Sequence, residues 1–339
     1  MIVDLRSDTV TRPTPEMYEA MAKAPLGDDV LGDEPTVAEL ERVAAERMAM
    51  EAAVFVPSGT MGNQIALAAH TSPGDAVIFE EEAHMLFYEC GAPAVLSGVV
   101  SWTVPSERGI MAPEAIERRI LVRSLHSPGT TVVCIENTHN RAGGTIIPLT
   151  TMAEYRVLAD KHGLKVHLDG ARVFNAAVSL GVPVSTITQH VDSVSFCLSK
   201  GLSSPVGSVL CGPADFIERA RQWRKRVGGG MRQSGILAAC GLVSLNSMVD
   251  RLAEDHRRAQ DLASGLQGIS GLRIPEQPET NIVMVETAGP AERWTEAIQA
   301  HDVWAFPFGA SRIRLVLHKD IDDAGVEQAI DAFRTVSKA

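Results

Sequence analysis

The sequence predicts an α/β protein in which a mostly parallel sheet is flanked by helices and followed by a smaller α+β domain. Short β-rich segments alternate with helical segments along the first part of the chain, and this alternation changes after about residue 246. A chain of 339 residues with 45% hydrophobic content can form two domains, or one large domain with an appendage. We therefore expect an N-terminal arm at residues 1–28, a large domain at 29–245 and a small domain at 246–339.

Five segments of the expected large domain have the composition of buried strands. They are DAVIFE (75–80), TTVVCIEN (130–137), LKVHLD (164–169), SVSFCLS (193–199) and GSVLCG (207–212). Between the second and the third, residues 151–163 carry Met152, Tyr155 and Leu158 at helical spacing and end on Gly163. This segment is a predicted crossover helix, the usual connection between neighbouring parallel strands.

The expected small domain has a different order of elements. A helix at residues 249–268 leads to two strands, and a helix follows each strand. The strands are NIVMVET (281–287) and RIRLVLH (312–318), and the helices are AERWTEAIQAHD (291–302) and DAGVEQAIDAFRTVS (323–337). This order is typical of a small α+β domain.

Charge and composition exclude several classes of partner. The formal net charge of -11, without a long lysine or arginine tract, argues against nucleic acid or an anionic membrane as the main partner. The one basic cluster, at residues 219–226, is typical of a solvated helix face. No apolar run approaches the roughly 18 residues of a membrane span, and Asp4, Arg6 and Asp8 exclude a signal-peptide core at the start. We expect a cytoplasmic protein that binds neither nucleic acid nor membrane.

The cysteines indicate a reducing environment. Their number is odd, they form no CxxC pair, and most of them lie in apolar runs: Cys90, Cys134, Cys197, Cys211 and Cys240. We expect reduced core thiols and no metal site.

Candidate chemistry gathers where predicted strands end, which is where open α/β sheets bind ligands. Asp169 closes LKVHLD and is followed by Gly170, Ala171 and Arg172, and Lys200 follows SVSFCLS. Taken alone, Lys200 is more simply a surface lysine at a strand end. Together, the acid, the arginine and the lysine match the needs of pyridoxal phosphate. This cofactor takes a lysine for a Schiff base, a carboxylate for its ring nitrogen and donors for its phosphate.

A candidate phosphate site lies in PSGTMGNQIAL, residues 57–67, a small-residue turn that leads into a helix. The backbone amides near Gly59 and Thr60 and the helix N-terminus could hold a phosphate dianion. The same residues also form an ordinary N-cap sequence. Their occurrence together with Asp169 and Lys200 favours the phosphate site.

Three histidines deserve separate interpretations. His84 follows DAVIFE, where an imidazole could stack on the pyridine ring or move a proton, although a lone loop histidine is more often a surface group. His126 lies in a turn-like segment without a local functional signal. For His139, which lies just past a strand, a turn-stabilising role is as plausible as a functional one.

Seven stretches of the chain together resemble the L-threonine aldolases of low stereospecificity, which are pyridoxal phosphate enzymes of the aspartate aminotransferase fold. They are DLRSDTVTRPTPEM, LGDDVLGDEPTVAELE, PSGTMGNQIAL, CIENTHNRAGGTIIPL, VHLDGARVFNAA, SFCLSKGLSSPVGSVLCG and WRKRVGGGMRQSGILAA. The resemblance spans nearly the whole chain. It is specific for the β-eliminating amino-acid lyase group, and within that group for threonine aldolase, and it implies a sheet of the seven-stranded type.

The resemblance implies a role for each matching residue. Those that match cofactor-binding and catalytic groups are Lys200 (Schiff base), Asp169 (ring nitrogen), Gly59 and Thr60 (phosphate loop), His84 (stacked on the ring) and His126 (near the substrate hydroxyl). Those that match the groups binding the substrate carboxylate are Ser7, Arg172 and Arg314, a task suited to the guanidinium fork, and Arg172 also matches a cofactor-binding group. Lys225 and Arg232 match residues that reach the phosphate from a neighbouring subunit. A homo-oligomer with shared active sites, a dimer of dimers, is therefore expected.

One position departs from the family. Leu31 of GDDVLGDEP stands where many members carry tyrosine, so substrate size preference and local hydrogen bonding are in doubt, whereas the cofactor chemistry is not.

The implied reaction is a retro-aldol cleavage of L-threonine, L-allo-threonine or another β-hydroxy-α-amino acid to glycine and an aldehyde. The residues leave open whether His84, His126 or an ordered water accepts the hydroxyl proton. An aminotransferase, racemase or tryptophanase-like β-elimination would share Lys200 and Asp169. A nicotinamide enzyme is disfavoured because no GxGxxG opens a first crossover helix. A non-catalytic binding protein is also disfavoured, because the residues that match a cofactor site would then have no function.

Overall fold

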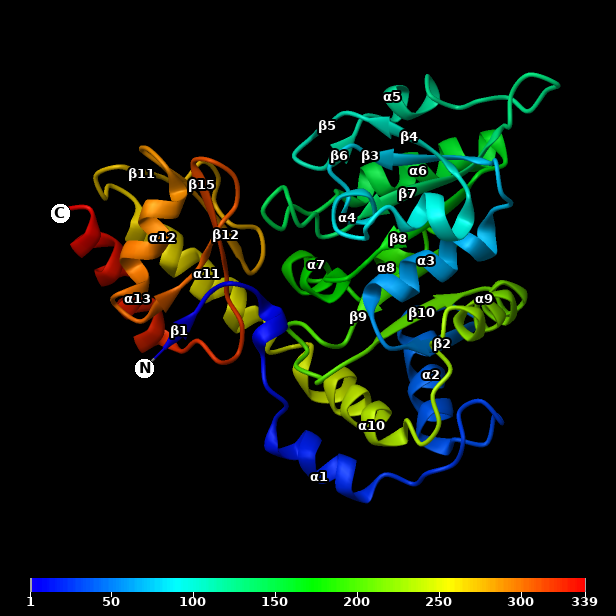
Figure 1. Cartoon of the computed structure of the whole chain (residues 1–339), viewed down its shortest axis with the longest axis horizontal. Coiled ribbons are helices and arrows are strands. Elements are labelled where there is room, and N and C mark those ends of the chain that lie inside the picture. The colour runs from blue at the N-terminus through cyan, green and yellow to red at the C-terminus, as the bar shows by residue number, and fades with distance from the viewer. Residues whose placement is uncertain (1, 339) are drawn as a thin grey trace.

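The chain folds into two parts, each built around its own sheet (Figure 1). The computed structural model describes residues 2–338. The larger part contains a seven-stranded sheet, and the smaller part contains a four-stranded sheet built from residues after 271. The proposed boundaries after residues 28 and 245 stay predictions.

The strands of the large sheet run in the order β2-β10-β9-β8-β7-β3-β4. β10 is antiparallel to both of its neighbours, and the pairings from β9 to β4 are parallel. All five predicted strands are present, and two strands that the composition did not reveal complete the sheet. The bounds are β2 (Ala52–Val56), β3 (Ala76–Glu80), β4 (Val100–Val104), β7 (Thr130–Glu136), β8 (Lys165–Asp169), β9 (Ser193–Cys197) and β10 (Ser208–Gly212).

Helices cover both faces of the large sheet, as the alternating side chains of its buried strands require. Ala53 and Phe55 of β2 belong to the hydrophobic cluster that also contains residues of α2, α6, α7 and α10, whereas Val54 and Val56 belong to the cluster formed with α3 and α9. The crossover helix predicted at 151–163 is α6, and Gly163 caps it with a φ of 66°. The bounds are α1 (Pro15–Lys23), α2 (Pro35–Arg47), α3 (Gly59–His70), α4 (His84–Phe87), α5 (Pro113–Glu117), α6 (Leu149–His162), α7 (Val173–Leu180), α8 (Ser185–Thr188), α9 (Ala214–Arg226) and α10 (Gly235–Val243).

The small sheet is antiparallel and has the order β11-β12-β15-β14. The predicted helices and the two predicted strands are present, and two short strands were not predicted. The bounds are α11 (Leu252–Leu266), β11 (Leu272–Arg273), β12 (Ile282–Thr287), α12 (Ala291–Gln299), β14 (Phe306–Pro307), β15 (Arg312–Val316) and α13 (Asp323–Val336).

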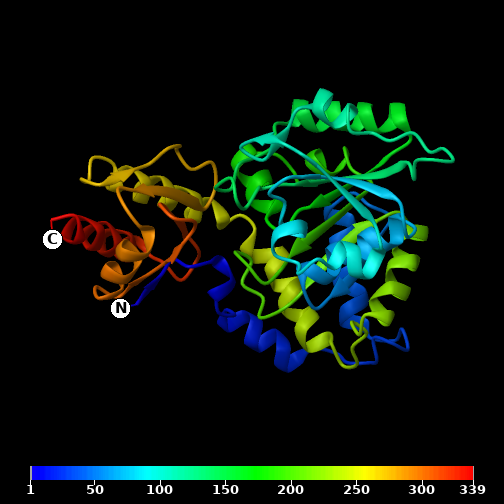
Figure 2. The ribbon, with the colours of Figure 1, turned by 45° about the horizontal axis from the view of Figure 1, so that its top comes forward.

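The start of the chain is bound to the small part. β1 (Val3–Asp4) pairs in parallel with β13 (Val303–Trp304), and Val3 and Leu5 belong to the small hydrophobic core. The chain then crosses to the large part, where α1 packs along α10 (Figures 1 and 2). Residues 5–14 therefore lie where the two parts meet.

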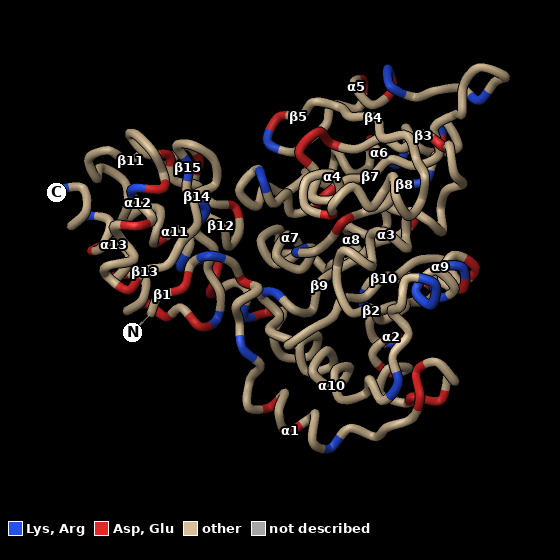
Figure 3. The backbone as a smooth tube through the Cα atoms, in the orientation of Figure 1, with Lys and Arg blue, Asp and Glu red and all other residues tan. Residues whose placement is uncertain are grey.

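Positive and negative residues are interspersed along both parts of the chain (Figure 3). The basic cluster on α9 differs from the expected solvated face. Arg224 is buried and bonds Asp29 and the Phe55 carbonyl, and Arg221 bonds Glu41. These arginines hold α9 to the rest of the large part. The apolar contacts of α9 place their guanidinium groups over the edge of the sheet.

All five cysteines are free; four of them are buried, and Cys90 is exposed. Within residues 2–338, no single helix is long and apolar enough to cross a membrane; one bent pair, Gly235–Met248 with Leu252–Leu266, meets the length and composition criteria with a bend of 66°.

Candidate active site

A cavity of about 370 Å³ lies between the two parts, at the carboxyl ends of β7 and β8. The N-terminal segment, the turn after β9 and the small sheet close its other sides. Six of the residues predicted from the sequence line this cavity: Ser7, His84, Asp169, Arg172, Lys200 and Arg314. Residues up to 307 positions apart in the chain are therefore brought to one place.

Asp169 is the last residue of β8, and Lys200 follows β9, the neighbouring parallel strand. The carboxylate of Asp169 accepts a hydrogen bond of 2.8 Å from Asn63 and one of 3.1 Å from the Ala171 amide. Among residues 2–338, the amine of Lys200 has no hydrogen-bond or ion-pair partner. A free amine and a braced, buried carboxylate thus face the same cavity.

Arg172 is held by Asp8 through two hydrogen bonds, of 2.8 Å from Nε and 2.6 Å from Nη2. Both side chains are buried. Burial alone would raise the pKa of Asp8, but the charge and hydrogen bonds of Arg172 hold it well below its usual value. Nη1 is the one guanidinium nitrogen of Arg172 that does not bond Asp8, and it donates a hydrogen bond of 3.4 Å to Asn140 Oδ1.

Arg314, on β15, is the less paired of the two arginines. Its Nη1 donates to Asn140 at 2.6 Å, and its Nε is buried without a hydrogen-bond partner. Arg314 forms no ion pair with any described residue. Burial, and next the charge of Arg172, lower its pKa to about 10, so the guanidinium remains positive at neutral pH. This cation is suited to receive an anionic ligand.

His84 begins the short helix α4 and lines the cavity. Its backbone amide donates to Glu136 at 2.7 Å, and its ring Nδ1 lies 2.9 Å from Glu89. Burial would lower the pKa of His84, but the hydrogen bond to Glu89 and the negative charge of Asp169 raise it above the usual value.

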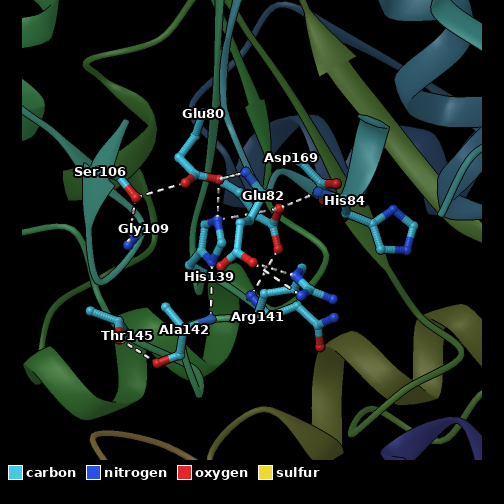
Figure 4. Close-up of polar contacts among 12 residues, drawn as sticks. Glu80, Glu82, His84, Ser106, Gly109, His139, Arg141, Ala142, Thr145 and Asp169 are labelled. Atoms are coloured by element: carbon cyan, nitrogen blue, oxygen red, sulfur yellow. Dashed lines mark hydrogen bonds and ion pairs between the residues drawn. The ribbon is translucent and has the colours of Figure 1, made fainter. Parts of the chain in front are cut away.

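His139 lies outside the cavity, in a buried cluster shown in Figure 4. Its Nε2 is 2.9 Å from Glu80, and its Nδ1 accepts a hydrogen bond of 3.2 Å from the Ala142 amide. Burial would lower the pKa of His139, but Glu136 and Glu80 raise it. These contacts give His139 a turn-stabilising role.

The candidate phosphate loop begins α3, as predicted. Ser58 is its N-cap and accepts a hydrogen bond from the Met61 amide. A Cβ on Gly59 would lie 2.8 Å from Cys197 Sγ, and one on Gly62 would lie 2.3 Å from Ser195 Oγ. Glycine is therefore required for α3 to pack so closely on β9, and this places the α3 N-terminus near the turn that carries Lys200.

Six other residues singled out from the sequence lie outside the cavity of the single chain. His126 is exposed in the turn between Ser124 and Ser127, and Arg232 is exposed and pairs with Asp28 at 2.9 Å. Leu31 is 75% exposed and lines a second hollow of about 540 Å³ together with Lys225. Gly59 and Thr60 of the α3 loop also do not line the cavity itself.

Sequence reasoning missed the polar residues that brace this site: Asp8, Asn63, Glu89, Glu136 and Asn140. Glu136 could have been found because it is the second-last residue of the strand predicted at 130–137, and it lies opposite Asp169 of the neighbouring strand. The other four residues lie in loops or turns or inside a helix. At such positions the sequence does not indicate whether an acidic or amide side chain faces the site.

Comparison with known proteins decides the family. Residues 4–290 match the beta-eliminating lyase family. The protein named probable low-specificity L-threonine aldolase 2 of Arabidopsis thaliana is 47% identical over 98% of this chain and 97% of its own length. The low specificity L-threonine aldolase of Escherichia coli K12 is 42% identical over 94% of this chain and 95% of its own length. The chain belongs to the low-specificity L-threonine aldolase family.

Solved structures show that this threonine aldolase family member has an aspartate aminotransferase-like fold. A threonine aldolase of Leishmania major superposes with a TM-score of 0.85 at 20% identity, covering 98% of this chain and 99% of its own. An aspartate aminotransferase of Thermus thermophilus superposes with a TM-score of 0.73 at 17% identity, covering 99% and 91%. The predicted fold class is therefore confirmed.

Proposed function

We propose that the chain is a pyridoxal phosphate-dependent aldolase that cleaves L-threonine, L-allo-threonine and related β-hydroxy-α-amino acids to glycine and an aldehyde. The observation that carries this function is the meeting of Lys200, Asp169 and the guanidinium of Arg314, which has no acidic partner among the described residues, in one cavity. The relatives named low-specificity L-threonine aldolases support the reaction and the substrate class.

The residues present fit the cofactor. Lys200 offers a free amine, Asp169 offers a carboxylate for a ring N–H, and the α3 N-terminus offers backbone amides for a phosphate. The hydroxyl of Thr138, which lines the cavity, is buried without a hydrogen-bond partner. The hydroxyl of Ser208, which lies beside Gly59 and does not line the cavity, is also buried without one. Pyridoxal phosphate supplies an electron-withdrawing ring that takes up the electron pair released when a bond to Cα breaks.

The arginines divide the work of binding the substrate. Arg314 gives the positive charge that a substrate carboxylate needs, and Ser7, next to the Arg6 carbonyl that Arg314 contacts, adds a hydroxyl to the cavity lining. Two N–H donors of Arg172 are already bonded to Asp8. Its contribution to substrate binding therefore comes chiefly from Nη1 and from its positive charge. Holding the carboxylate fixes the rotation about the substrate nitrogen, and this rotation selects the bond that breaks.

The hydroxyl proton needs an acceptor within the cavity. His84 is the histidine that lines it, and its Nε2 has no partner among the described residues. An ordered water held by His84 would serve equally. His126 would take part only from a neighbouring subunit, because it is exposed outside the cavity in its own chain.

We further propose a homo-oligomer, a dimer or a dimer of dimers, in which subunits complete one another's sites. Leu31 and Lys225 share an outward-facing hollow, and Arg232 lies close by on the exposed turn that follows α9. Exposed Val122 and Leu125 beside His126 are apolar surface that a partner would cover. We place the enzyme in the cytoplasm, in threonine breakdown and glycine formation.

The direct test is a product assay. Purified protein with pyridoxal phosphate and L-threonine should release glycine and acetaldehyde in equal amounts. Release of ammonia with a keto acid, formation of D-allo-threonine by inversion at Cα, or transfer of the amino group to a keto acid would instead indicate β-elimination, racemisation or transamination on the same scaffold.

A further inference from the structure

Glu89 lies behind the cavity wall, next to two residues that line it. Its side chain is fully buried, and its carboxylate and the nearest polar atoms of His84 and Asp169 all lie within 4.8 Å of one another. Glu89 itself does not line the cavity. Any effect of Glu89 on the reaction must therefore pass through a neighbour.

Three donors surround the Glu89 carboxylate. Oε1 receives Asn63 Nδ2 at 3.0 Å and lies 2.9 Å from His84 Nδ1, and Oε2 receives Gln64 Nε2 at 2.5 Å. An amide nitrogen can only donate, so two of these contacts require acceptor oxygens on Glu89. A proton on His84 Nδ1 completes the set, whereas a bare Nδ1 would leave a lone pair facing the carboxylate.

Asn63 connects this pair to Asp169. Its Nδ2 donates both to Glu89 and to Asp169 Oδ2, at 2.8 Å, while its Oδ1 lies 3.3 Å from Nε2 of the buried His167. The reversed amide orientation would direct a carbonyl oxygen at two carboxylates, so the nitrogen must face them. One amide thus bridges two buried acids, and each acid can also bind a different positive partner.

Two buried negative charges this close require two positive counterparts. The ring N–H of the cofactor suits Asp169, and the N–H of the His84 imidazole suits Glu89. We propose that Glu89 is a positioning residue of this aldolase, which holds His84 with its proton on Nδ1 and its Nε2 toward the cavity. Asn63 braces Glu89 and Asp169 together, and the inference rests on the proposed function only for its effect on turnover.

The consequence for the reaction concerns the cavity side of the ring. With Nδ1–H directed at Glu89, Nε2 is the nitrogen that exchanges a proton with the substrate hydroxyl or with a water held beside it. A buried carboxylate behind a histidine fixes the tautomer and stabilises the imidazolium that forms. The other charged groups near the ring are Asp169, which favours the protonated form, and Lys200, which opposes it.

The test begins with the apoenzyme, because its readout does not depend on catalysis. Nitrogen-15 NMR of histidine-labelled protein, with His84 assigned through His84→Gln, should show His84 protonated on Nδ1. In Glu89→Gln, the side chain keeps its shape but loses its charge, and the His84 titration midpoint should fall by about one pH unit or more. In the loaded enzyme, kcat should fall about tenfold or more while KM for threonine changes less than about twofold, and Glu89→Asp should recover part of the loss.

Glu80→Gln is the matched control. Glu80 is an equally buried acid that holds His139 at 2.9 Å, outside the cavity (Figure 4). This variant should lower stability and leave the His84 titration unchanged. A wild-type His84 without a proton on Nδ1, or a Glu89→Gln titration that matches wild type, would overturn the proposal, and the wild-type spectrum decides alone if Glu89→Gln does not fold. Absence of aldolase activity with the NMR result intact would refute the proposed function instead.

Discussion

Asp8 and Arg172 form a two-point ion pair, with bonds of 2.6 and 2.8 Å, at the wall of the cavity. The two residues lie 164 positions apart, and both are buried. The pair joins the N-terminal segment to the turn after β8, so it closes the cavity on the side where the two parts of the molecule meet. A charge removed from either member leaves the other buried without a counterion.

Asp8→Asn should therefore lower the free energy of unfolding by about 3 to 5 kcal/mol and raise KM for threonine. Stability should be measured by urea unfolding of the apoenzyme, and KM in the loaded enzyme. Asp255→Asn is the control, because Asp255 makes a similar two-point pair with Arg251 on α11, outside the cavity. This control should lose stability and keep KM. An Asp8→Asn enzyme with wild-type stability and KM would contradict the role given to the pair.

The attachment of the cofactor is tested at Lys200. Borohydride should fix the cofactor covalently to Lys200, and Lys200→Ala should lose turnover while its fold, followed by circular dichroism, persists. Asp169→Ala should also lose most activity because the ring nitrogen would no longer stay protonated. Peptide mapping that finds the label on another lysine would refute the assignment, and a nearly wild-type rate in Asp169→Ala would remove that residue from the site.

Arg314 should act mainly in binding the amino acid. Arg314→Ala removes the one cavity guanidinium without an acidic partner among the described residues, and a charged hydrogen bond of this kind contributes about 1.5 to 3 kcal/mol. KM for threonine should therefore rise by about tenfold to a hundredfold, with a smaller change in kcat. Arg312→Ala is the control, because Arg312 is exposed on the same strand. A KM that rises in the control and not in Arg314→Ala would identify Arg312 as the carboxylate ligand.

Stability should decline in mild acid because buried histidines resist protonation. Burial lowers the pKa of His167 and of His256 to about 4. Between that pH and about 6.5, the unfolded chain binds protons that the folded chain does not, so the free energy of unfolding falls as pH is lowered. His256→Gln should reduce this slope by up to about 1.4 kcal/mol per pH unit. Urea unfolding at a series of pH values measures it, and an unchanged slope would contradict the burial argument.

The sequence predicted the strands that end at candidate catalytic residues more reliably than the strands at the edges of the sheet. Strands such as Ala76–Glu80 are buried on both faces and show continuous apolar composition, whereas Val100–Val104 is an edge strand with three exposed residues. The Lys200 and Asp169 positions followed from strand ends. Contacts such as that of Asp8 with Arg172 depend on how the two parts pack. No local sequence pattern indicates that these two residues are close in space. The positions of Lys225 and Arg232 relative to a partner lie beyond any single chain.

The sharing of active sites between subunits is tested by mixing two inactive variants. The side chain of Arg232 is 61% exposed, and Asp28 is its one ion-pair partner among residues 2–338, so it could exchange this exposed pair for a neighbour's phosphate region. If Arg232 serves the partner's cofactor, a mixed dimer of Lys200→Ala and Arg232→Ala chains has one site with both defects. Its other site takes its lysine and its arginine from unmutated positions.

Co-expression with two different tags allows the mixed species to be purified and its composition confirmed by mass. Its activity should approach about half that of the wild-type dimer, since one site of two is intact. Each variant purified alone should be nearly inactive, which sets the baseline. Activity of confirmed mixed dimers no higher than that baseline would show that Arg232 acts within its own chain, because each site would then carry one of the two defects.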